Sequence, residues 1–324
     1  MKKRIAALFL AAILICLAGC RGRNTAVKVD KNTVDEAEYA FYLNYNRYGD
    51  PKKVSSERDL PAAREEAIAQ IVSNEVVRIK CREYGLTIPK EEKARLSSWK
   101  DSFIDMLGGK AAYLQYLNDS CLTDRGYDKL SENELYFEML FDRVTEDESF
   151  TYTDEQLRRF FGENYIKVKY VFFSFTDDTG FLLGEKETAV KRNAAQTVLE
   201  KAKEEGVDFD ALISEYSEDV FAPGGSGGII VSRLEAKGTG YLEAAFGLSD
   251  NEVGGLYEDS TGLYIVKRLP VEASFYEENM LGINETAKNM LFSELLAEWC
   301  AEAKVTVSKS VDKINFDNLK KYVR

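Results

Sequence analysis

Residues 209–219 read FDALISEYSED, and residues 224–230 read GGSGGII. The apolar residues of the first stretch fall three or four positions apart, which predicts the buried face of a short helix over 208–216. The glycine run predicts a turn, and the isoleucines after it begin an expected strand over 229–232. The chain therefore passes from helix to strand through a glycine turn, which is typical of a small mixed domain.

The neighbouring residues extend this mixed pattern in both directions. Residues 165–172 (YIKVKYVF) alternate between apolar and other side chains, which predicts a strand, and a helix is expected over about 185–205. After the glycine turn we expect a short helix over 241–248 and a closing pair of strands over 256–269. The block 165–269, about 105 residues, is thus predicted to be one compact α+β domain of ordinary size.

Helical periodicity dominates the chain on both sides of this block. Apolar residues three and four positions apart predict helices over 60–81, 89–107, 123–144 and 275–304. We expect residues 35–164 and 270–324 to pack on each other as one helical domain, with the α+β domain inserted between them. Residues 20–34 are polar and lack periodicity, and they are expected to form a tether.

The composition supports a folded chain and excludes histidine chemistry. Hydrophobic residues make up 45% of the 324 residues, which is enough apolar surface to exclude disorder over most of the length. There is no histidine, so no Ser-His-Asp or Cys-His nucleophile and no histidine-ligated zinc or haem can form. The glycine run lacks the Lys-Ser/Thr of a phosphate loop, and there is no CxxC motif. We therefore expect no cofactor and no metal.

The N-terminus is typical of an export signal. Three basic residues at 2–4 precede an apolar run of 15 residues, Ile5–Gly19, which is shorter than the roughly 20 residues of a membrane span and fits a signal peptide over 1–19. The run ends in Leu-Ala-Gly before Cys20, which resembles the lipobox of bacterial lipoproteins. That resemblance implies cleavage before Cys20 and lipid attached to it. An ordinary signal peptide with a chance cysteine is the alternative.

The net charge indicates which binding partners are disfavoured, and the cysteine content bears on disulfide formation. Loss of the signal, with its three positive charges, takes the net charge from −12 to −15. An acidic surface disfavours nucleic acid as a partner, and lipid rather than charge would hold the protein at a membrane. Cys81, Cys121 and Cys300 are expected to be small buried apolar residues. One disulfide between two of them is the alternative.

Four segments, in order, resemble the parvulin (PpiC-type) peptidyl-prolyl isomerase domain. They are 167–172 as the first strand, 209–219 as the helix leading into the family's YSxD, 224–230 as its GGDLGWF turn and strand, and 241–246, 251–254 and 261–267 as its closing helix, turn and strand. With the lipobox and the flanking helices, the mature chain resembles PrsA-type foldase lipoproteins and SurA-like chaperones. The resemblance implies a parvulin-like antiparallel sheet with surrounding helices, inserted into an N-terminal chaperone domain that the C-terminal helix completes.

The same resemblance implies a site. Parvulins place two histidines across the sheet beside an Asp or Cys, and these positions fall at Tyr170, Tyr264 and Asp219. The aromatic residues of the proline pocket fall at Tyr241 and Phe246. Both histidines are therefore tyrosines, whose reference pKa near 10 makes them neutral dipoles at neutral pH. The pair could keep a hydrogen-bonded network across the sheet, or the two rings could be packed core residues with the network lost.

Aromatic residues are also dense near the start of the helical domain. They are Tyr39, Phe41, Tyr42, Tyr45 and Tyr48. We expect them mainly to pack one helix into the core. The alternative is that they line a groove for unfolded segments, in which case aromatic side chains would be exposed in a cleft.

The sequence thus predicts a foldase held by lipid on the extracytoplasmic face of the cell membrane. Its expected partners are unfolded or newly secreted polypeptides with X-Pro segments, and its activity would be peptidyl-prolyl cis-trans isomerisation. The missing histidines leave its status as an enzyme open. The alternative is a non-catalytic chaperone or peptide-binding lipoprotein with a degenerate parvulin domain. The sequence is compatible with a monomer and with a homodimer.

Overall fold

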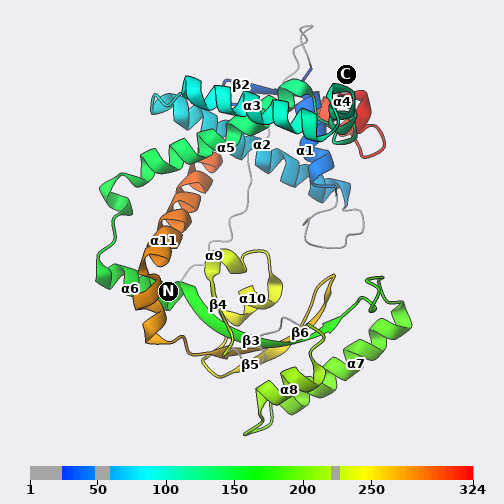
Figure 1. Ribbon diagram of the computed structural model, residues 1–324, viewed down its shortest axis with the longest axis vertical. Coiled ribbons are helices and arrows are strands. Elements are labelled where there is room, and N and C mark those ends of the chain that lie inside the picture. The colour runs from blue at the N-terminus through cyan, green and yellow to red at the C-terminus, as the bar shows by residue number, and fades with distance from the viewer. Residues whose placement is uncertain (1–23, 48–58, 220–226, 324) are drawn as a thin grey trace. The chain divides into compact units, whose positions relative to one another are not determined.

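The computed structural model describes residues 24–47, 59–219 and 227–323 (Figure 1). The expected signal peptide, Cys20, Tyr48 and the first part of the glycine run lie outside these residues. The chain divides into two compact units. The first comprises the chain up to Phe150 together with the part from Leu291 onward, and the second is Thr151–Met290.

A three-stranded antiparallel sheet joins distant parts of the chain in the first unit. β1 (Thr25–Val29) pairs with β2 (Asn32–Asp35) on one edge and with β7 (Val305–Val307) on the other. Val27 and Val29 are fully buried. The expected tether over 20–34 is therefore wrong for residues 25–34. The alternation in β1 is too short to stand out, and its partner β7 lies almost at the other end of the sequence.

Helices complete the first unit. They are α1 (Glu36–Tyr45), α2 (Leu60–Glu83), α3 (Lys90–Met106), α4 (Lys110–Asp119), α5 (Asp124–Thr145), the part of α11 (Ala273–Glu302) from Leu291, and the short 3-10 helices η1 (Glu148–Phe150), η2 (Lys309–Lys313) and η3 (Leu319–Lys321). Side-chain caps fix two of the starts, since Asp35 accepts from the Glu38 N–H and Thr123 from the Gly126 N–H. Phe292 of α11 is buried in one cluster with Leu140 of α5, so the C-terminal helix contributes to the core of this unit.

A four-stranded antiparallel sheet forms the centre of the second unit. The strand order is β4 (Ile229–Ser232), β3 (Tyr165–Ser174), β6 (Gly262–Leu269) and β5 (Val253–Glu258). The predicted α+β class and the antiparallel sheet are confirmed. Alternate residues of β3 face opposite sides, so that Tyr170 belongs to one buried cluster and Val171 to another.

Helices cover both faces of this sheet (Figure 1). α7 (Glu185–Ala202) and α8 (Phe209–Tyr216) lie on one face, and the short helices α9 (Arg233–Ala236) and α10 (Gly240–Ala245) lie on the other. The unit extends beyond the expected 165–269, because α6 (Asp154–Asn164) and the first part of α11 pack together through Leu157, Tyr276 and Ile283. These contacts move the boundaries to Thr151 and Met290.

Candidate functional site

The segment after α8 places Asp219 beside the central strand β3. β4 pairs with β3 over residues 165–168, and farther along the same edge of β3 the backbone groups are bonded by Ser217 and Glu218. The Phe172 N–H donates to Ser217 Oγ at 3.1 Å, and the Glu218 N–H donates to the Phe172 carbonyl at 2.8 Å. The part of the β3 edge that extends beyond β4 is thereby protected from pairing with another chain. The same bonds bring Asp219, the next residue, to the Tyr170 side chain.

Tyr170 is bonded to Asp219. Its hydroxyl donates to Asp219 Oδ2 at 2.7 Å, and the residue is buried. Burial, together with the hydrogen bond to the carboxylate, raises the pKa of Tyr170 well above its usual value. The phenol therefore keeps its proton throughout the physiological pH range.

Tyr264 is bonded to a different partner. Its hydroxyl lies 2.9 Å from Thr261 Oγ1, and Thr261 Oγ1 in turn donates to Asp259 Oδ1 at 2.6 Å. Because the threonine has one proton and gives it to the carboxylate, Tyr264 is the donor in the first bond. Burial raises the pKa of Tyr264 as well. Of the two tyrosines at the expected catalytic positions, Tyr170 thus donates directly to a carboxylate, whereas Tyr264 is linked to a different carboxylate through Thr261.

The rings of three tyrosines pack on one another, and we call Tyr170, Tyr241 and Tyr264 the tyrosine cluster. Tyr241 of α10 stacks on Tyr264 with ring centroids 4.0 Å apart and planes 8° from parallel. The Tyr170 ring stands edge-on to both, at 5.5 and 5.9 Å. Within the part of the chain that the structure describes, the Tyr241 hydroxyl has no hydrogen-bond partner, and burial raises its pKa strongly. It is therefore a neutral donor at physiological pH.

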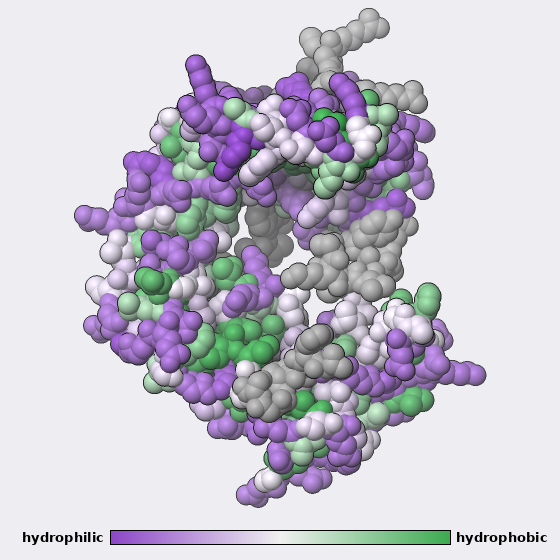
Figure 2. Space-filling view, viewed as in Figure 1, coloured by the Kyte–Doolittle hydropathy of each residue, from purple (hydrophilic) through white to green (hydrophobic). Residues whose placement is uncertain are grey.

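Phe246 lies in the same buried cluster of residues, next to a cation that the sequence did not indicate. The Arg233 guanidinium carbon stands 4.1 Å from the centroid of the Phe246 ring, so a cation–π contact occupies one face of that ring. Apolar side chains gather over β4 and its neighbouring short helices on the face drawn in Figure 2. Ile229 of β4 and Leu234 of α9 are each 36% exposed, which leaves apolar surface on these two elements.

A close contact at Gly262 keeps the strands around the cluster in register. A Cβ at this position would lie 2.1 Å from the Phe173 carbonyl oxygen and 2.5 Å from the Phe172 ring. Phe172 in turn packs against Tyr264 with centroids 4.7 Å apart. The sequence did not identify Phe172, Asp259, Thr261 and Gly262 as residues of the site. The Thr261-Gly262 pair at the start of β6, typical of a tight turn, was the available signal.

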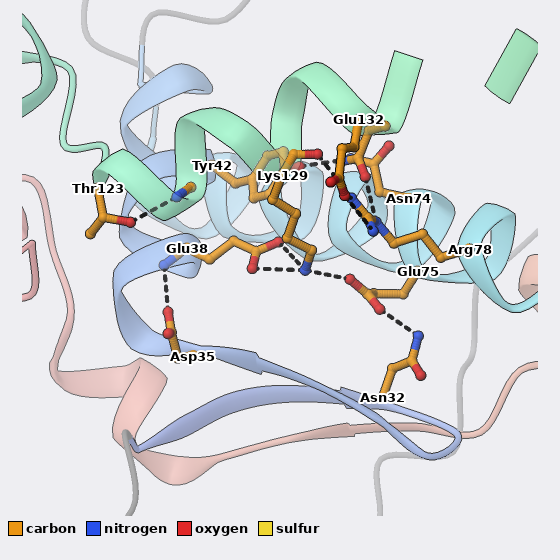
Figure 3. Close-up of polar contacts among 12 residues, drawn as sticks. Asn32, Asp35, Glu38, Tyr42, Asn74, Glu75, Arg78, Thr123, Lys129 and Glu132 are labelled. Atoms are coloured by element: carbon orange, nitrogen blue, oxygen red, sulfur yellow. Dashed lines mark hydrogen bonds and ion pairs between the residues drawn. The ribbon is translucent and has the colours of Figure 1, made fainter. Parts of the chain in front are cut away.

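A second polar site lies in the first unit (Figure 3). Lys129 of α5 stands between two carboxylates, with Nζ 2.8 Å from Glu38 Oε1 and 2.6 Å from Glu75 Oε1. Glu75 is 3% exposed, and its other oxygen accepts from Asn32 Nδ2 at 2.6 Å. Burial raises the pKa of Glu38, and the neighbouring Lys129 opposes this only in part. These bonds connect α1, α2, α5 and β2 through buried charges.

The dense aromatic segment divides between core and surface. Tyr39 and Tyr42 are buried, which confirms the expected packing into the core, whereas Tyr45 is 58% exposed. Phe41 and Tyr45 contribute to a hollow of about 560 Å³ between α1, α2 and α5.

The part of the chain that the structure describes contains three cysteines. Cys81, Cys121 and Cys300 are free and buried, which confirms their assignment as small apolar residues. Burial raises the pKa of Cys81 to about 11, so this thiol is unreactive at neutral pH. Among the described helices none is both long and apolar enough to cross a bilayer.

Comparisons with known proteins give structural neighbours alone. No family model and no curated protein matches the sequence. Among solved structures, the chain is similar to the foldase protein PrsA from Streptococcus pneumoniae, with 17% identity, 93% of this chain and 98% of that chain covered, and a TM-score of 0.35. It is also similar to PrsA from Bacillus cereus, with 15% identity, coverage of 93% and 97%, and a TM-score of 0.29.

A third structural neighbour comes from Campylobacter jejuni and is described as a SurA-like chaperone. It shares 9% identity with this chain, the match covers 88% of this chain and 99% of that one, and the TM-score is 0.35. These neighbours are of the kinds that the sequence motifs resemble. At such identities and TM-scores these neighbours carry no conclusion about function. The evidence for function lies in the residues of this chain.

Proposed function

We propose that the protein is an extracytoplasmic folding factor whose second unit binds X-Pro segments of unfolded polypeptides at the tyrosine cluster and speeds their cis-trans isomerisation. The observation that carries this proposal is the bond of the Tyr170 hydroxyl to Asp219 beside the half-buried rings of Tyr241 and Tyr264. An apolar aromatic surface, fixed dipoles and one carboxylate thus lie within a few ångströms of one another.

The reaction requires binding rather than bond chemistry. Rotation about a peptide bond has a barrier of about 18–20 kcal/mol, which arises from conjugation between nitrogen and carbonyl. The twisted amide is less polar than the planar one, and its nitrogen regains a lone pair that can accept a hydrogen bond. A site that binds this twisted form more tightly than the planar form lowers the barrier. No proton has to be transferred, so the absence of histidine does not exclude the reaction.

Each residue of the site has a distinct role in this proposal. The Tyr241 hydroxyl is the donor to the twisted amide nitrogen, because it is neutral and has no partner among the described residues. Asp219 and Tyr170 present a fixed dipole to the peptide group. The pyrrolidine ring packs against the half-buried ring of Tyr264, while Phe246 lies under Arg233 at the edge of the site.

A second candidate is a non-catalytic chaperone with a degenerate isomerase domain. The parallel stack of Tyr241 on Tyr264, with centroids 4.0 Å apart, favours it, because the two rings leave no room between them for a proline ring. Binding of a proline ring there needs the Tyr241 side chain to rotate away. A surface that only holds an apolar segment needs no such movement.

Two assays on the full chain separate these candidates. Exchange of a short X-Pro peptide between cis and trans is followed by NMR, and suppression of aggregation is followed with a thermally unfolded client. The first candidate predicts both activities. Suppression of aggregation with isomerisation at the rate of buffer would select the second candidate. If both activities were absent, the proposal of a folding factor would be rejected.

Anchoring through lipid on Cys20 is part of the same proposal. The support is the Leu-Ala-Gly-Cys stretch after a 15-residue apolar run. The expected result in a bacterial host is a membrane-bound protein with a mass increased by acyl groups. A Cys20→Ser variant is expected in the soluble extracytoplasmic fraction at its unmodified mass. Wild-type protein found in that soluble fraction would contradict the anchor and leave the isomerase proposal intact.

A further inference from the structure

A pocket of the first unit lies beside its first strand, and we call it the polar pocket. Its volume is about 430 Å³, and its wall includes Thr25 of β1, Thr33 of β2 and the first turns of α5. Pockets that hold small ligands have volumes of this order. Apart from one glycine, the wall consists of hydroxyl and charged side chains. A ligand of this pocket is therefore polar.

One face of α5 gives the polar pocket charges of both signs. Arg125, Asp128, Lys129 and Glu132 all belong to the wall, and their spacing places them on the same side of the helix. Along the helix, a cation and a carboxylate alternate. A ligand with a single charge would therefore meet repulsion as well as attraction, whereas a ligand with both charges can match the pattern.

Arg125 is the cation that is available to a ligand. Lys129 is already bonded to Glu38 (Figure 3), and the guanidinium of Arg78 is bonded to Glu132 at 3.3 Å. Arg125, by contrast, is exposed and has no hydrogen bond or ion pair with any described residue. A guanidinium binds a phosphate group through two parallel hydrogen bonds. Arg125 can therefore hold a phosphate in the polar pocket.

Asp128 offers the opposite charge one helical turn farther along α5. Its Oδ1 accepts from Lys100 Nζ at 2.7 Å, and its Oδ2 has no partner among the described residues. Three residues of a helix rise by about 4.5 Å, which is similar to the spacing of phosphorus and nitrogen in a phosphoethanolamine group. The two threonine hydroxyls of the wall can donate to the remaining phosphate oxygens.

The length of the chain before the first strand brings the polar pocket close to a membrane. Asn24 is part of the fold, since its carbonyl accepts from the Glu36 N–H at 3.1 Å. Four peptide steps join Asn24 to Cys20, and they reach at most about 14 Å. With lipid on Cys20, the pocket that begins at Thr25 stays near the lipid headgroups. Tethering raises their effective concentration, so a weakly binding pocket would be occupied.

Charge decides which headgroup fits. The chain without its signal carries a net charge of −15, which disfavours an anionic headgroup such as phosphatidylglycerol. Four carboxylates and three cations line the polar pocket, which favours a headgroup with both charges. A primary ammonium donates hydrogen bonds to a carboxylate, whereas the trimethylammonium of phosphatidylcholine has no N–H to donate. Phosphatidylethanolamine therefore fits best.

We propose that the polar pocket binds the phosphoethanolamine headgroup of a membrane lipid, with the phosphate on Arg125 and the ammonium on Asp128. The inference rests on the proposed lipid anchor at Cys20, and it depends neither on isomerisation nor on binding of unfolded polypeptides. An anchor at one residue leaves the attached unit free to rotate. A headgroup in the polar pocket adds a second point of attachment and fixes which side of the first unit faces the membrane.

The test uses the mature chain from Arg21 onward, which lacks the signal and the lipid and keeps every described residue. Flotation with phosphatidylcholine vesicles is expected to show binding only when they also contain phosphatidylethanolamine. Arg125→Ala is expected to weaken this binding about tenfold. Arg143→Ala is the matched control, because Arg143 lies on the same helix, is 48% exposed and is not part of the wall. Equal binding by Arg125→Ala and wild type would overturn the proposal.

Asp128→Asn tests the site for the ammonium. The amide keeps an oxygen that accepts from Lys100 and removes the negative charge. Binding to vesicles that contain phosphatidylethanolamine is expected to weaken about fivefold, at an unchanged melting temperature. Binding as tight as that of wild type would refute the role of this carboxylate.

Competition and lipid composition distinguish other sources of the same chemistry. Soluble glycerophosphoethanolamine at millimolar concentration is expected to displace the chain from the vesicles, whereas inorganic phosphate at the same concentration is not. Equal displacement by both would assign the pocket to free phosphate and reject the lipid. Equal binding to pure phosphatidylcholine, or tighter binding to phosphatidylglycerol, would also reject the proposal.

Failure of the pocket and failure of the anchor give different results. A lipid-modified wild-type protein whose unlipidated chain ignores phosphatidylethanolamine would reject the polar pocket and keep the anchor. Headgroup binding by a chain whose Cys20 is unmodified in cells would reject the anchor and support the pocket.

Discussion

The Tyr170 hydroxyl donates to Asp219 Oδ2 over 2.7 Å, although the two residues are 49 positions apart. The bond depends on Ser217 and Glu218, which are themselves bonded to the edge of β3. Four consecutive residues, Tyr216–Asp219, thus end a helix, cover a strand edge and supply a carboxylate.

Removing this hydroxyl is expected to reduce isomerisation. Tyr170→Phe keeps the ring and deletes the donor, so the dipole fixed by Asp219 is lost. We expect kcat/KM to fall about tenfold, equivalent to about 1.4 kcal/mol of transition-state stabilisation, and the free energy of unfolding to fall by about 1 kcal/mol. Tyr216→Phe is the control, because its hydroxyl bonds to Lys201 on the surface. Equal losses in the two variants would contradict the role of Tyr170.

Gly262 and Gly255 form a matched pair of strand glycines. A Cβ at 262 meets the Phe173 carbonyl oxygen at 2.1 Å, whereas a Cβ at 255 meets no atom within 4 Å. Gly262→Ala is expected to destabilise the second unit by more than about 2 kcal/mol, and Gly255→Ala to change its stability by less than about 1 kcal/mol. Urea unfolding of both variants provides the measurement. A Gly262→Ala variant as stable as Gly255→Ala would show that β3 and β6 are not held this closely.

Lys129 is expected to be essential for the first unit. In Lys129→Met, the carboxylates of Glu38 and Glu75 would remain buried without their shared cation. We expect a loss of about 3–5 kcal/mol at pH 8, because an uncompensated buried charge is costly. Burial already raises the pKa of Glu38, and without the lysine this pKa would rise further, so the native state would bind more protons than the unfolded state and the loss would shrink towards pH 5. Urea unfolding at the two pH values tests this, and a loss independent of pH would argue against the charge as its cause.

Alkaline pH is expected to destabilise the chain through its buried tyrosines. Burial raises the pKa of Tyr39 to about 12 and moves those of Tyr42, Tyr170 and Tyr241 in the same direction. Below pH 10 these phenols are neutral in both states, so they cause no pH dependence. Above pH 10 the unfolded chain loses protons that the folded chain keeps, and stability falls with rising pH. Part of the phenolate absorbance, that of the buried tyrosines, should therefore appear only together with unfolding.

The second unit could be predicted from the sequence because its signals are local. Period-two alternation predicted β3, and the run from Phe209 to Asp219 predicted a helix followed by a carboxylate. The boundaries moved because α6 and the start of α11 pack on each other through Leu157 and Tyr276. A pattern within one helix cannot indicate its partner.

The rest could not be predicted because it depends on contacts between distant residues. β1 was interpreted as tether, since its second partner β7 comes from the other end of the sequence. Arg233 over Phe246 and the Thr261–Asp259 link to Tyr264 depend on turn geometry. Lys129 lies in a helix as one of many charged residues, and its two carboxylates come from two other helices.

The pairing of β1 with β7 sets an order for folding. Residues 27–29 pair with residues 305–307, so the three-stranded sheet cannot close until both segments are present. The contacts of the second unit, by contrast, lie within Thr151–Met290. Contacts between distant residues also form slowly, because their loop entropy must be overcome first. The tyrosine cluster would therefore mature before the polar pocket beside β1, and a chain truncated before Val305 would keep the first site and lose the support of the second.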